Sequence, residues 1–446
     1  MGGKPQADFS VQGESWWMDL MKVKNMSKIK SVSSKVMSFA AALFSFAAVC
    51  DCAVAATEAV DPQKSSEFSM ASGVDYYADP VTGNDSHDGR SPDHAFRTLD
   101  RASRVLKAGD TLHLKAGSVF KESLLFRSSG TSAKPIRVKG NGAVLTGLEP
   151  VPNDSWCDQG DGLWLSTNKM FWGACRPRVL LPDRTMVSVE VWDPAFKNPK
   201  LLKAGQAAWN LKGIWFRCAP EKRPQDYRLS GYYRVSGVEV SNRHNWIVEN
   251  LTVEHFTNDG INVHGLCRGL YFFDIVARQN GDDGFSIHEN VYASVRNLHV
   301  WGNDFGISDI SQSQSVFSGV VAESNRICGV DFHGGIRILR DATVRDNQGN
   351  QIVISSEVRG KNVDNPNPML RGTVLLEDVR VEGGEGSGVV VKSGCTVSII
   401  NSRISGVKTG LKLEGGRVHL ENSKVERCAQ ITEKAPDCEL TCAGAR

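Results

Sequence analysis

The sequence predicts an all-β protein built as a solenoid of parallel strands, and two observations support this prediction. Glycines follow short polar turns at Gly260, Gly284, Gly306 and Gly329, which stand 24, 22 and 23 residues apart. A fixed period in the twenties is typical of solenoids, in which each repeat stacks on the one before it. The residues after each Gly alternate between apolar and polar, as in a strand with one buried face. We therefore expect parallel coils whose strands lie about 4.8 Å apart.

The polar positions of these strands predict a functional face. Parallel stacking keeps equivalent residues in register, so residues two and four positions after each Gly form two columns. The first column is Asn262, Ser286, Ser308 and Asp331, and the second is His264, His288, Ile310 and His333. A solvent-facing strand has no structural need for three histidines in register. We expect this face to line a groove on the middle coils.

Composition excludes several functional classes. The chain has 446 residues, of which 41% are apolar and 23% are charged, as in a soluble globular protein with an ample core. Its 52 Lys and Arg residues barely exceed its 50 Asp and Glu residues, and no long basic run occurs, so we expect no nucleic-acid partner. We expect a monomer.

The N-terminal region predicts export. Three lysines between residues 28 and 35 precede an apolar run over residues 36–49, and the small residues Ala53-Val54-Ala55 follow. This order is typical of a secretory signal peptide, and the apolar run is too short to span a membrane. We expect residues 1–55 to comprise an upstream extension, which ends near Met26, and a signal peptide cleaved near Ala55. The mature protein would be secreted or periplasmic; the alternative is an uncleaved anchor.

Cysteine usage gives a weaker signal. Cleavage at this point would leave nine of the eleven cysteines, and an odd number requires at least one thiol outside any intramolecular disulfide. No C-x-x-C pair occurs, which argues against a zinc cluster. We expect Cys267, Cys328 and Cys395 to be buried at coil corners. Three further cysteines could pair near the C-terminus: Cys428, Cys438 and Cys442.

The remaining chain divides into five segments. Residues 56–75 read as a polar linker, 76–148 as an N-terminal cap with the first coils, 149–241 as an insertion, 242–428 as the main coils and 429–446 as a C-terminal tail. Within the cap, a short helix is expected from Thr98 to Lys107. Thr98 is a plausible N-cap, apolar residues share one face of the helix, and Gly109 ends it.

The cap carries a resemblance to a known family. The segments 76–80 (Y-Y-x-D-P), 83–89 (G-N-D-S-x-D-G), 96–99 (F-R-T-L) and 108–117 (A-G-D-T-L-x-L-K-A-G) resemble the N-terminal cap of secreted right-handed parallel β-helix proteins of the pectate-lyase-like superfamily. That family includes many polysaccharide lyases. The resemblance implies a right-handed parallel β-helix whose open end is covered by the helix, since a terminal coil otherwise exposes its core and its strand edges.

The insertion over residues 149–241 loses the coil period and is rich in tryptophan. It holds six of the ten tryptophans: Trp156, Trp164, Trp172, Trp192, Trp209 and Trp215. One interpretation is a strand-rich insertion with its own small aromatic core. The other is an aromatic wall on which sugar rings stack.

The face on the middle coils predicts proton-transfer chemistry. Imidazole exchanges a proton near neutral pH, and carboxylates on adjacent coils can act as acids or bases. The predicted catalytic residues are His264, His288, His333, Asp331 and Asp283. The predicted substrate-binding residues are Asn262, Ser286, Ser308, Arg337 and Trp301. Against this reading, Asp and Asn before Gly are also favoured simply because they suit tight turns.

Two turns carry a second, looser resemblance. The segments 258–261 (N-D-G-I) and 282–284 (D-D-G) look like the acid and base turns of polygalacturonase-type hydrolases, although Trp301-Gly302-Asn303 stands where that family has Gly-His-Gly and Ile336-Arg337-Ile338 only loosely matches its Arg-Ile-Lys. The same turns resemble the calcium-binding turns of β-helix lyases. That resemblance implies a calcium site at Asp259, Asp282 and Asp283, with His288 or His333 in place of the usual Lys or Arg base.

The predicted function is therefore the cleavage of a polysaccharide by a carbohydrate-active enzyme with the parallel β-helix fold. An acidic polysaccharide is one expected substrate. A lyase is slightly favoured over a glycoside hydrolase. The alternatives are a non-catalytic glycan-binding or cell-envelope protein and a sugar epimerase. A fold hosts many functions, so the site has to distinguish them.

Overall fold

The structure is a computed structural model that describes residues 73–167, 176, 178–191, 193–210, 212–356 and 371–444. The predicted upstream extension, signal peptide and most of the linker lie outside these residues, as do Trp172 and Trp192. Among the helices of the described part, none has the length and apolar character needed to cross a membrane.

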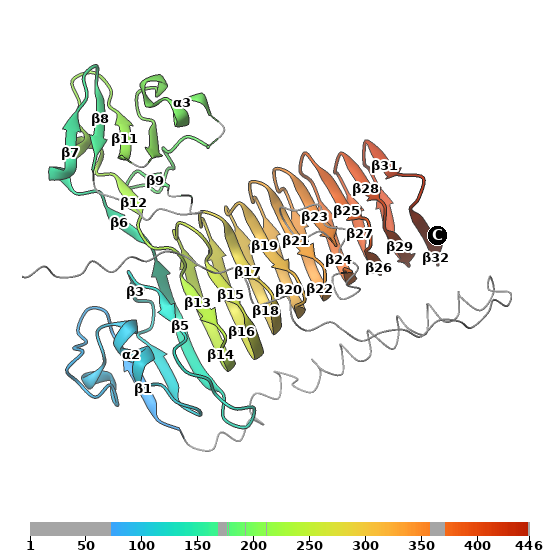
Figure 1. The fold of residues 1–446 in the computed structure, drawn as a ribbon, viewed down its shortest axis with the longest axis horizontal. Coiled ribbons are helices and arrows are strands. Elements are labelled where there is room, and N and C mark those ends of the chain that lie inside the picture. Colours follow the sequence, from blue (N-terminus) through green and yellow to red (C-terminus); the bar gives the residue numbers. More distant parts are fainter. Residues whose placement is uncertain are drawn as a thin grey trace, which may run out of the picture. The chain divides into compact units, whose positions relative to one another are not determined.

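Two parallel sheets form the solenoid, and Figure 1 shows their strands stacked coil on coil. Sheet A has 15 strands: β1 (Asp75–Ala78), β2 (Thr111–Leu114), β3 (Val119–Phe120), β5 (Ile136–Thr146), β14 (His244–Glu254), β16 (Leu266–Arg278), β18 (Asn290–Trp301), β20 (Gln314–Glu323), β22 (Ile336–Arg345), β24 (Thr373–Glu382), β26 (Thr396–Ile400), β27 (Arg403–Ser405), β29 (Arg417–Glu421), β30 (Lys424–Glu426) and β32 (Glu439–Ala443). Sheet B has ten: β4 (Leu124–Leu125), β13 (Val238–Ser241), β15 (Ile261–His264), β17 (Asp283–Ile287), β19 (Phe305–Ile310), β21 (Cys328–His333), β23 (Asn350–Ser355), β25 (Ser387–Lys392), β28 (Thr409–Glu414) and β31 (Gln430–Lys434). The predicted parallel β-helix is confirmed.

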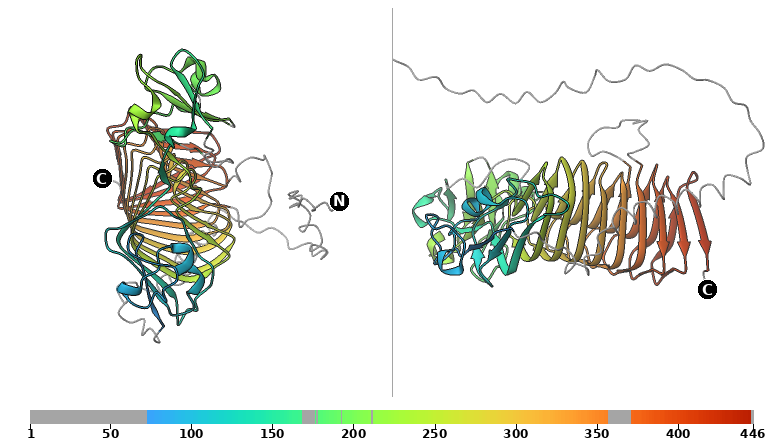
Figure 2. Two further views of the ribbon diagram at one scale, coloured as in Figure 1. Left: turned by 90° about the vertical axis from the view of Figure 1, so that its left-hand side faces the viewer. Right: turned by 90° about the horizontal axis from the view of Figure 1, so that it is seen from below.

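One coil contributes a short strand to sheet B and then a long strand to sheet A. The long strands bend at a residue in the left-handed conformation, and these residues pair in register from coil to coil, as with Asp274, Asn297 and Asp341. Asn, Asp and Gly adopt this conformation at the lowest cost. The inward side chains of both sheets form one continuous hydrophobic core. Figure 2 shows the stacked strands of the coils from two further sides.

The glycine period has a physical cause in an internal ladder of asparagines. Asn280, Asn303 and Asn325 are fully buried, and each accepts hydrogen bonds from the coil before it and donates to the side chain of the next. A Cβ added to Gly284 would lie 2.7 Å from the side-chain nitrogen of Asn303, and the other glycines of the period meet the ladder in the same way. The ladder therefore requires Gly at positions 260, 284, 306 and 329.

The ladder ends where the glycine period is broken. Asn347 is its last asparagine, and its side chain donates to Gln351 Oε1 at 2.7 Å. Gln351 occupies the glycine position of its coil, because Cys328 and Val330, on either side of Gly329, pair with Asn350 and Ile352. Its buried side chain thus takes the place of the next asparagine.

A helix covers the N-terminal end of the core, as predicted. Helix α2 (Leu99–Val105) is capped by the Thr98 side chain, which accepts from the backbone N–H of Arg101. Leu99 and Ala102 are fully buried in the same core as the first coils. Asp85 fixes the approach to the helix by accepting from the backbone N–H and the hydroxyl of Thr98.

The insertion is built of antiparallel strands, which distinguishes it from the coils. One sheet joins β7 (Trp156–Asp158), β8 (Leu163–Ser166), β11 (Gly213–Arg217) and β10 (Ala207–Asn210); a second joins β6 (Leu148–Pro150), β12 (Ser230–Tyr232) and β9 (Val179–Leu180). The remaining helices are η2 (Pro92–His94), η3 (Asn153–Ser155), α3 (Pro194–Lys197), η4 (Pro199–Leu201) and η5 (Pro224–Tyr227). Trp156, Trp164 and Trp215 pack against two small hydrophobic clusters within the insertion. For these three rings, the interpretation as part of a small core within the insertion is thus confirmed.

Two boundaries and one set of cysteines differ from the prediction. The solenoid resumes at Val238 rather than at residue 242, and the C-terminal tail adds β31 and β32 to the two sheets as a further coil. Cys267, Cys328 and Cys395 are buried, as expected. The expected pairing among Cys428, Cys438 and Cys442 is wrong, because all three are free thiols.

Candidate functional site on the outer face of sheet B

The predicted register of the candidate site is correct. Asn262 pairs with Ser286, Ser286 with Ser308, and Ser308 with Asp331 on neighbouring strands of sheet B. In the second column, Ile310 pairs with His333. The outward positions of successive coils thus share one face, because parallel pairing carries each position straight across the sheet.

This face is less open to solvent than the sequence suggested. Ser286 and Ser308 are 0% exposed and Asp331 is 4% exposed. The two serines were predicted to bind substrate, but buried hydroxyl groups cannot do so directly. Their role lies in the contacts they make beneath the surface.

A buried polar cluster lies where β15 and β17 adjoin. Ser286 Oγ donates to Asp283 Oδ2 at 2.7 Å and lies 2.8 Å from His288 Nε2. The ligand atoms of Asp259, Asp283 and His288 all lie within 4.8 Å of one another. The cluster therefore brings a carboxylate from each of two coils to one imidazole.

Burial and like charge make this cluster electrostatically unusual. Burial raises the pKa of the Asp259 carboxyl well above its ordinary value, and the charges of Asp283 and Asp282 raise it further. The backbone N–H of Asp283 donates to Asp259 Oδ1 and offsets only part of this effect. Neutralising the cluster requires a proton or a cation.

Asp282 does not join the cluster, which corrects the predicted set of three metal-binding aspartates. Its Oδ1 lies 3.8 Å from Arg176 Nη1, and this oxygen has no hydrogen-bond partner in the described part of the chain. Calcium takes six to eight oxygen ligands, whereas the cluster offers two carboxylates and a ring nitrogen. The residues present do not match a calcium site.

A pocket of about 380 Å³ lies further along the same face. Asp331, His333, Lys392 and Lys412 line it together with Glu414. His333 Nε2 lies 2.7 Å from Asp331 Oδ1. Because a carboxylate accepts hydrogen bonds, Nε2 of the His333 ring carries the proton in this contact and donates it to Asp331.

The two lysines correct the expectation that the functional face is confined to the middle coils. Lys392 and Glu414 pair in register on β25 and β28, and Lys412 pairs with Val390 beside them. The hydrogen bond from Lys412 to Glu414, 2.7 Å long, raises the pKa of Lys412 and keeps it charged. Lys392 stands four positions after Gly388 and Lys412 two positions after Gly410, so the same alternation marks both as outward.

The third predicted histidine lies at the opposite end of the face. His264 Nε2 is 3.1 Å from Glu239 Oε1, and its side chain is 37% exposed. Asn262 Nδ2 donates to the same carboxylate at 3.3 Å. His264 and Asn262 are thus available to a ligand, but they lie apart from the pocket at Asp331 and His333.

Two predicted substrate-binding residues lie elsewhere. Arg337 is 0% exposed and points into the solenoid, where its Nη2 lies 2.8 Å from the equally buried Asp309. Trp301 lies at the end of β18 in sheet A, with the guanidinium of Arg278 5.6 Å from its ring centre. Arg337 is thus too buried to contact a substrate directly, and Trp301 lies outside the predicted face. Asp309 stands at an inward position of the alternation, which is the signal that could have revealed a buried ion pair.

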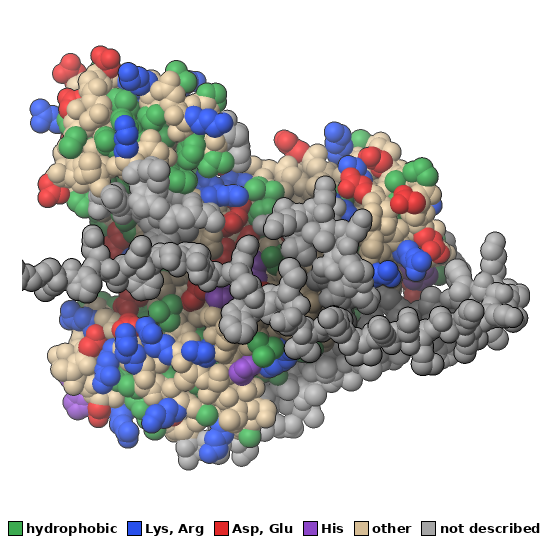
Figure 3. Space-filling view, in the orientation of Figure 1, with side chains coloured by type: hydrophobic (Ala, Val, Ile, Leu, Met, Phe, Trp, Pro, Cys, Tyr) green, Lys and Arg blue, Asp and Glu red, His purple; other side chains and the backbone are tan. Residues whose placement is uncertain are grey.

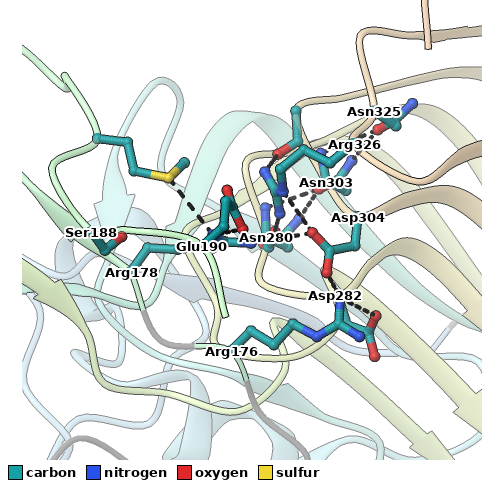
Figure 4. A network of polar contacts seen from close by, with 12 residues as sticks. Arg176, Arg178, Ser188, Glu190, Asn280, Asp282, Asn303, Asp304, Asn325 and Arg326 are labelled. Atoms are coloured by element: carbon teal, nitrogen blue, oxygen red, sulfur yellow. Dashed lines mark hydrogen bonds and ion pairs between the residues drawn. The ribbon is translucent and has the colours of Figure 1, made fainter. Parts of the chain in front are cut away.

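A network at the insertion was missed entirely. Arg176, Arg178 and Arg326 converge on the buried Asp304, and Arg178 also pairs with Glu190 (Figure 4). Burial lowers the pKa of Arg178 and of Arg326, although an arginine remains charged. No sequence signal links these residues, because Arg176, Arg178 and Glu190 lie outside the repeat.

Acidic, basic and histidine side chains show together in the middle of the face drawn in Figure 3. Apolar side chains are more frequent in the upper left part of this view. This pattern suits a polar ligand better than an apolar one.

Comparison with known proteins supports the fold. No protein-family model matches the sequence, and no curated protein matches it. A solved structure described as a glycoside hydrolase has a TM-score of 0.55 at 10% identity, covering 83% of this chain and 96% of that one. A complex of XylC with xylose has a TM-score of 0.53 at 13% identity, covering 79% and 70%. A pectate lyase, Pel9A, has a TM-score of 0.43 at 15% identity, covering 81% and 80%. The first two establish a shared fold.

Proposed function

We propose that the protein is an exported carbohydrate-active enzyme that cleaves an acidic polysaccharide by β-elimination on the outer face of sheet B. The observation that carries this proposal is the pocket in which the Asp331–His333 pair lies with Lys392 and Lys412. The two fold relatives support a carbohydrate substrate, since one is described as a glycoside hydrolase and the other was solved with xylose.

The pocket contains the groups that elimination requires. His333, held by Asp331, takes the proton on the ring carbon next to the uronate carboxylate. The electron pair of the broken C–H bond forms a carbon–carbon double bond. The glycosidic oxygen departs with the electrons of the broken C–O bond and takes a proton from water. Lys392 and Lys412 bind the uronate carboxylate and stabilise the negative charge that develops on it.

Glycoside hydrolysis is the second candidate, and one observation favours it. Asp259, whose carboxyl pKa is raised, lies beside Asp283, and two carboxyl groups with separated pKa values are the usual acid and base of hydrolases. Both aspartates are only 3% exposed, however. A glycosidic oxygen would have to reach them beneath the surface, so we favour elimination.

The test is a screen of the purified protein against acidic and neutral polysaccharides. Ultraviolet absorbance detects the unsaturated product of elimination, and reducing ends without that absorbance indicate hydrolysis. Elimination on a uronate polymer would support the proposal. If no polymer is cleaved but one binds, the protein is a glycan-binding protein.

Variants locate the activity. We expect His333→Ala to lower turnover by about 10²–10⁴-fold, the usual contribution of positioned proton transfer. The matched control is His299→Ala, since His299 also pairs with a carboxylate, Glu323 at 2.8 Å, but lies in sheet A. Equal activity of His333→Ala and the wild type would place the chemistry elsewhere.

A further inference from the structure

We propose that Asp259, Asp283 and His288 bind one divalent transition-metal cation, such as Zn²⁺ or Mn²⁺, on the outer face of sheet B. Asp259 lies on the turn before β15, Asp283 at the start of β17 and His288 directly after it, and none of the three lines the pocket. The inference does not depend on the proposed lyase activity.

The geometry needs little adjustment to hold an ion. Carboxylate oxygens and imidazole nitrogens bind zinc at about 2.0–2.2 Å, so two donors on one ion lie at most about 4.4 Å apart. The three candidate donors already lie within 4.8 Å of one another. Small side-chain rotations close the remaining gap.

The negative charge of the cluster is a second, independent reason to infer a bound cation. Asp259 and Asp283 are each 3% exposed, and burying two carboxylates together is costly without a compensating cation. The charged side chains that most affect the pKa of Asp259 are all acids: Asp283, Asp282 and Glu239. A bound cation would remove this repulsion.

Oxygen atoms flank the cluster without a partner of their own. Ser308 is 0% exposed, its hydroxyl has no hydrogen-bond partner in the described structure, and it pairs in register with Ser286. Asn262 pairs with Ser286 on the other side, and its buried Oδ1 also has no hydrogen-bond partner in the described structure. Buried oxygens of this kind normally contact water or an ion, and both lie on the face that carries the cluster.

The donor set selects the class of metal. A nitrogen ligand with two carboxylates suits zinc, manganese and related metals, whereas calcium prefers oxygen alone. Because Asp282 faces Arg176, the described residues also fall short of the ligand number that calcium needs.

The experiment is calorimetric titration of chelator-treated full-length protein with Zn²⁺, Mn²⁺ and Ca²⁺ in turn. We expect one Zn²⁺ or Mn²⁺ per chain, bound more tightly than Ca²⁺. Asp283→Asn and His288→Ala should each weaken binding by at least about 10–100-fold, the loss that even outer-shell substitutions cause. His264→Ala is the matched control, because His264 lies near a carboxylate on the same face but outside the cluster, and it should bind as the wild type does.

A measurement on the wild type guards against variants that fail to fold. Bound Zn²⁺ should protect His288 from acylation by diethyl pyrocarbonate while His264 stays reactive, as mapped by mass spectrometry. The inference is overturned if calcium binds as tightly as zinc, if neither substitution changes the affinity, if Zn²⁺ leaves His288 unprotected, or if no metal binds.

Discussion

Asn303 connects three successive coils through one buried side chain. Its Oδ1 accepts from the backbone and side chain of Asn280, and its Nδ2 donates to Ala277 O and Asn325 Oδ1. We expect Asn303→Ala to lower the free energy of unfolding by at least about 3 kcal/mol, because each buried group left unsatisfied costs about 1–3 kcal/mol. Urea unfolding measures this. The exposed Asn153→Ala is the control and should change it by less than about 0.5 kcal/mol; equal effects would contradict a structural role for the ladder.

The ionisation of Glu254 makes the stability of the folded protein depend on pH. Burial opposes its ionisation, but hydrogen bonds and charge from His255 and Arg278 outweigh burial and lower its pKa from 4.5 to about 2. A lowered carboxyl pKa stabilises the folded state above pH 4.5, and this contribution of about 3 kcal/mol is lost as the pH falls from 4.5 to about 2.

We therefore expect Glu254→Gln to be less stable than the wild type at neutral pH and to lose less stability over that acidic range. Urea unfolding at several pH values checks the slope. Glu433→Gln, at an exposed position, should keep the wild-type slope. A wild-type slope in Glu254→Gln would refute the assignment.

For individual residues, the sequence predicted the pairing register of the strands better than the burial of the side chains. Alternation after each Gly correctly placed Asn262, Ser286 and Asp331 in one column. It did not reveal that Ser286 is buried, because that depends on the side chains around it. The expectation that charged residues face outward failed for Arg337, whose partner Asp309 only the fold brings close.

The insertion is fastened to the solenoid by Asp304. Three arginines bind this carboxylate: Arg176, Arg178 and Arg326. We expect Asp304→Asn to destabilise the protein by about 3–5 kcal/mol, the usual cost of leaving buried charges unpaired. Limited proteolysis should then cut within residues 149–241 sooner than in the wild type. The exposed Asp274→Asn should leave the cleavage pattern unchanged; faster cutting confined to the coils would contradict this role.

The insertion could be recognised from the sequence, but the contacts that attach it to the solenoid could not. Loss of the period and the run of tryptophans marked its limits, since both are local properties. The ion pairs between Arg178 and Asp304 join residues 126 positions apart, and no spacing rule connects them. Contacts between a repeat and a segment outside it need the three-dimensional structure.

The final coil of the described residues covers the edges of β28 and β29. Strands β31 and β32 pair with β28 and β29. A chain ending at Ala429 would expose these edges, so we expect it to associate, because unpaired edge strands are templates for further pairing. Light scattering at several concentrations tests this. A chain ending at Ala443 keeps both strands and should stay dispersed; a dispersed shorter chain would show that the edges are protected otherwise.

For the molecule as a whole, the fold was predictable because it is repeated. Each coil gives the same local signal, so errors in one coil do not change the architecture. Function was less accessible, since Lys392 and His333 meet only because the coils between them stack. The pocket is a product of that stacking.

The ladder that ends at Gln351 also makes the coil an interchangeable unit. Any insert that supplies one Gly and one Asn at the spacing of Gly306 and Asn325 satisfies the hydrogen bonds of the coils on either side of it. Duplicating residues 303–324 would lengthen the substrate face by about 4.8 Å without a new fold. The architecture therefore grows in whole steps, and lineages or designers can lengthen it by copying.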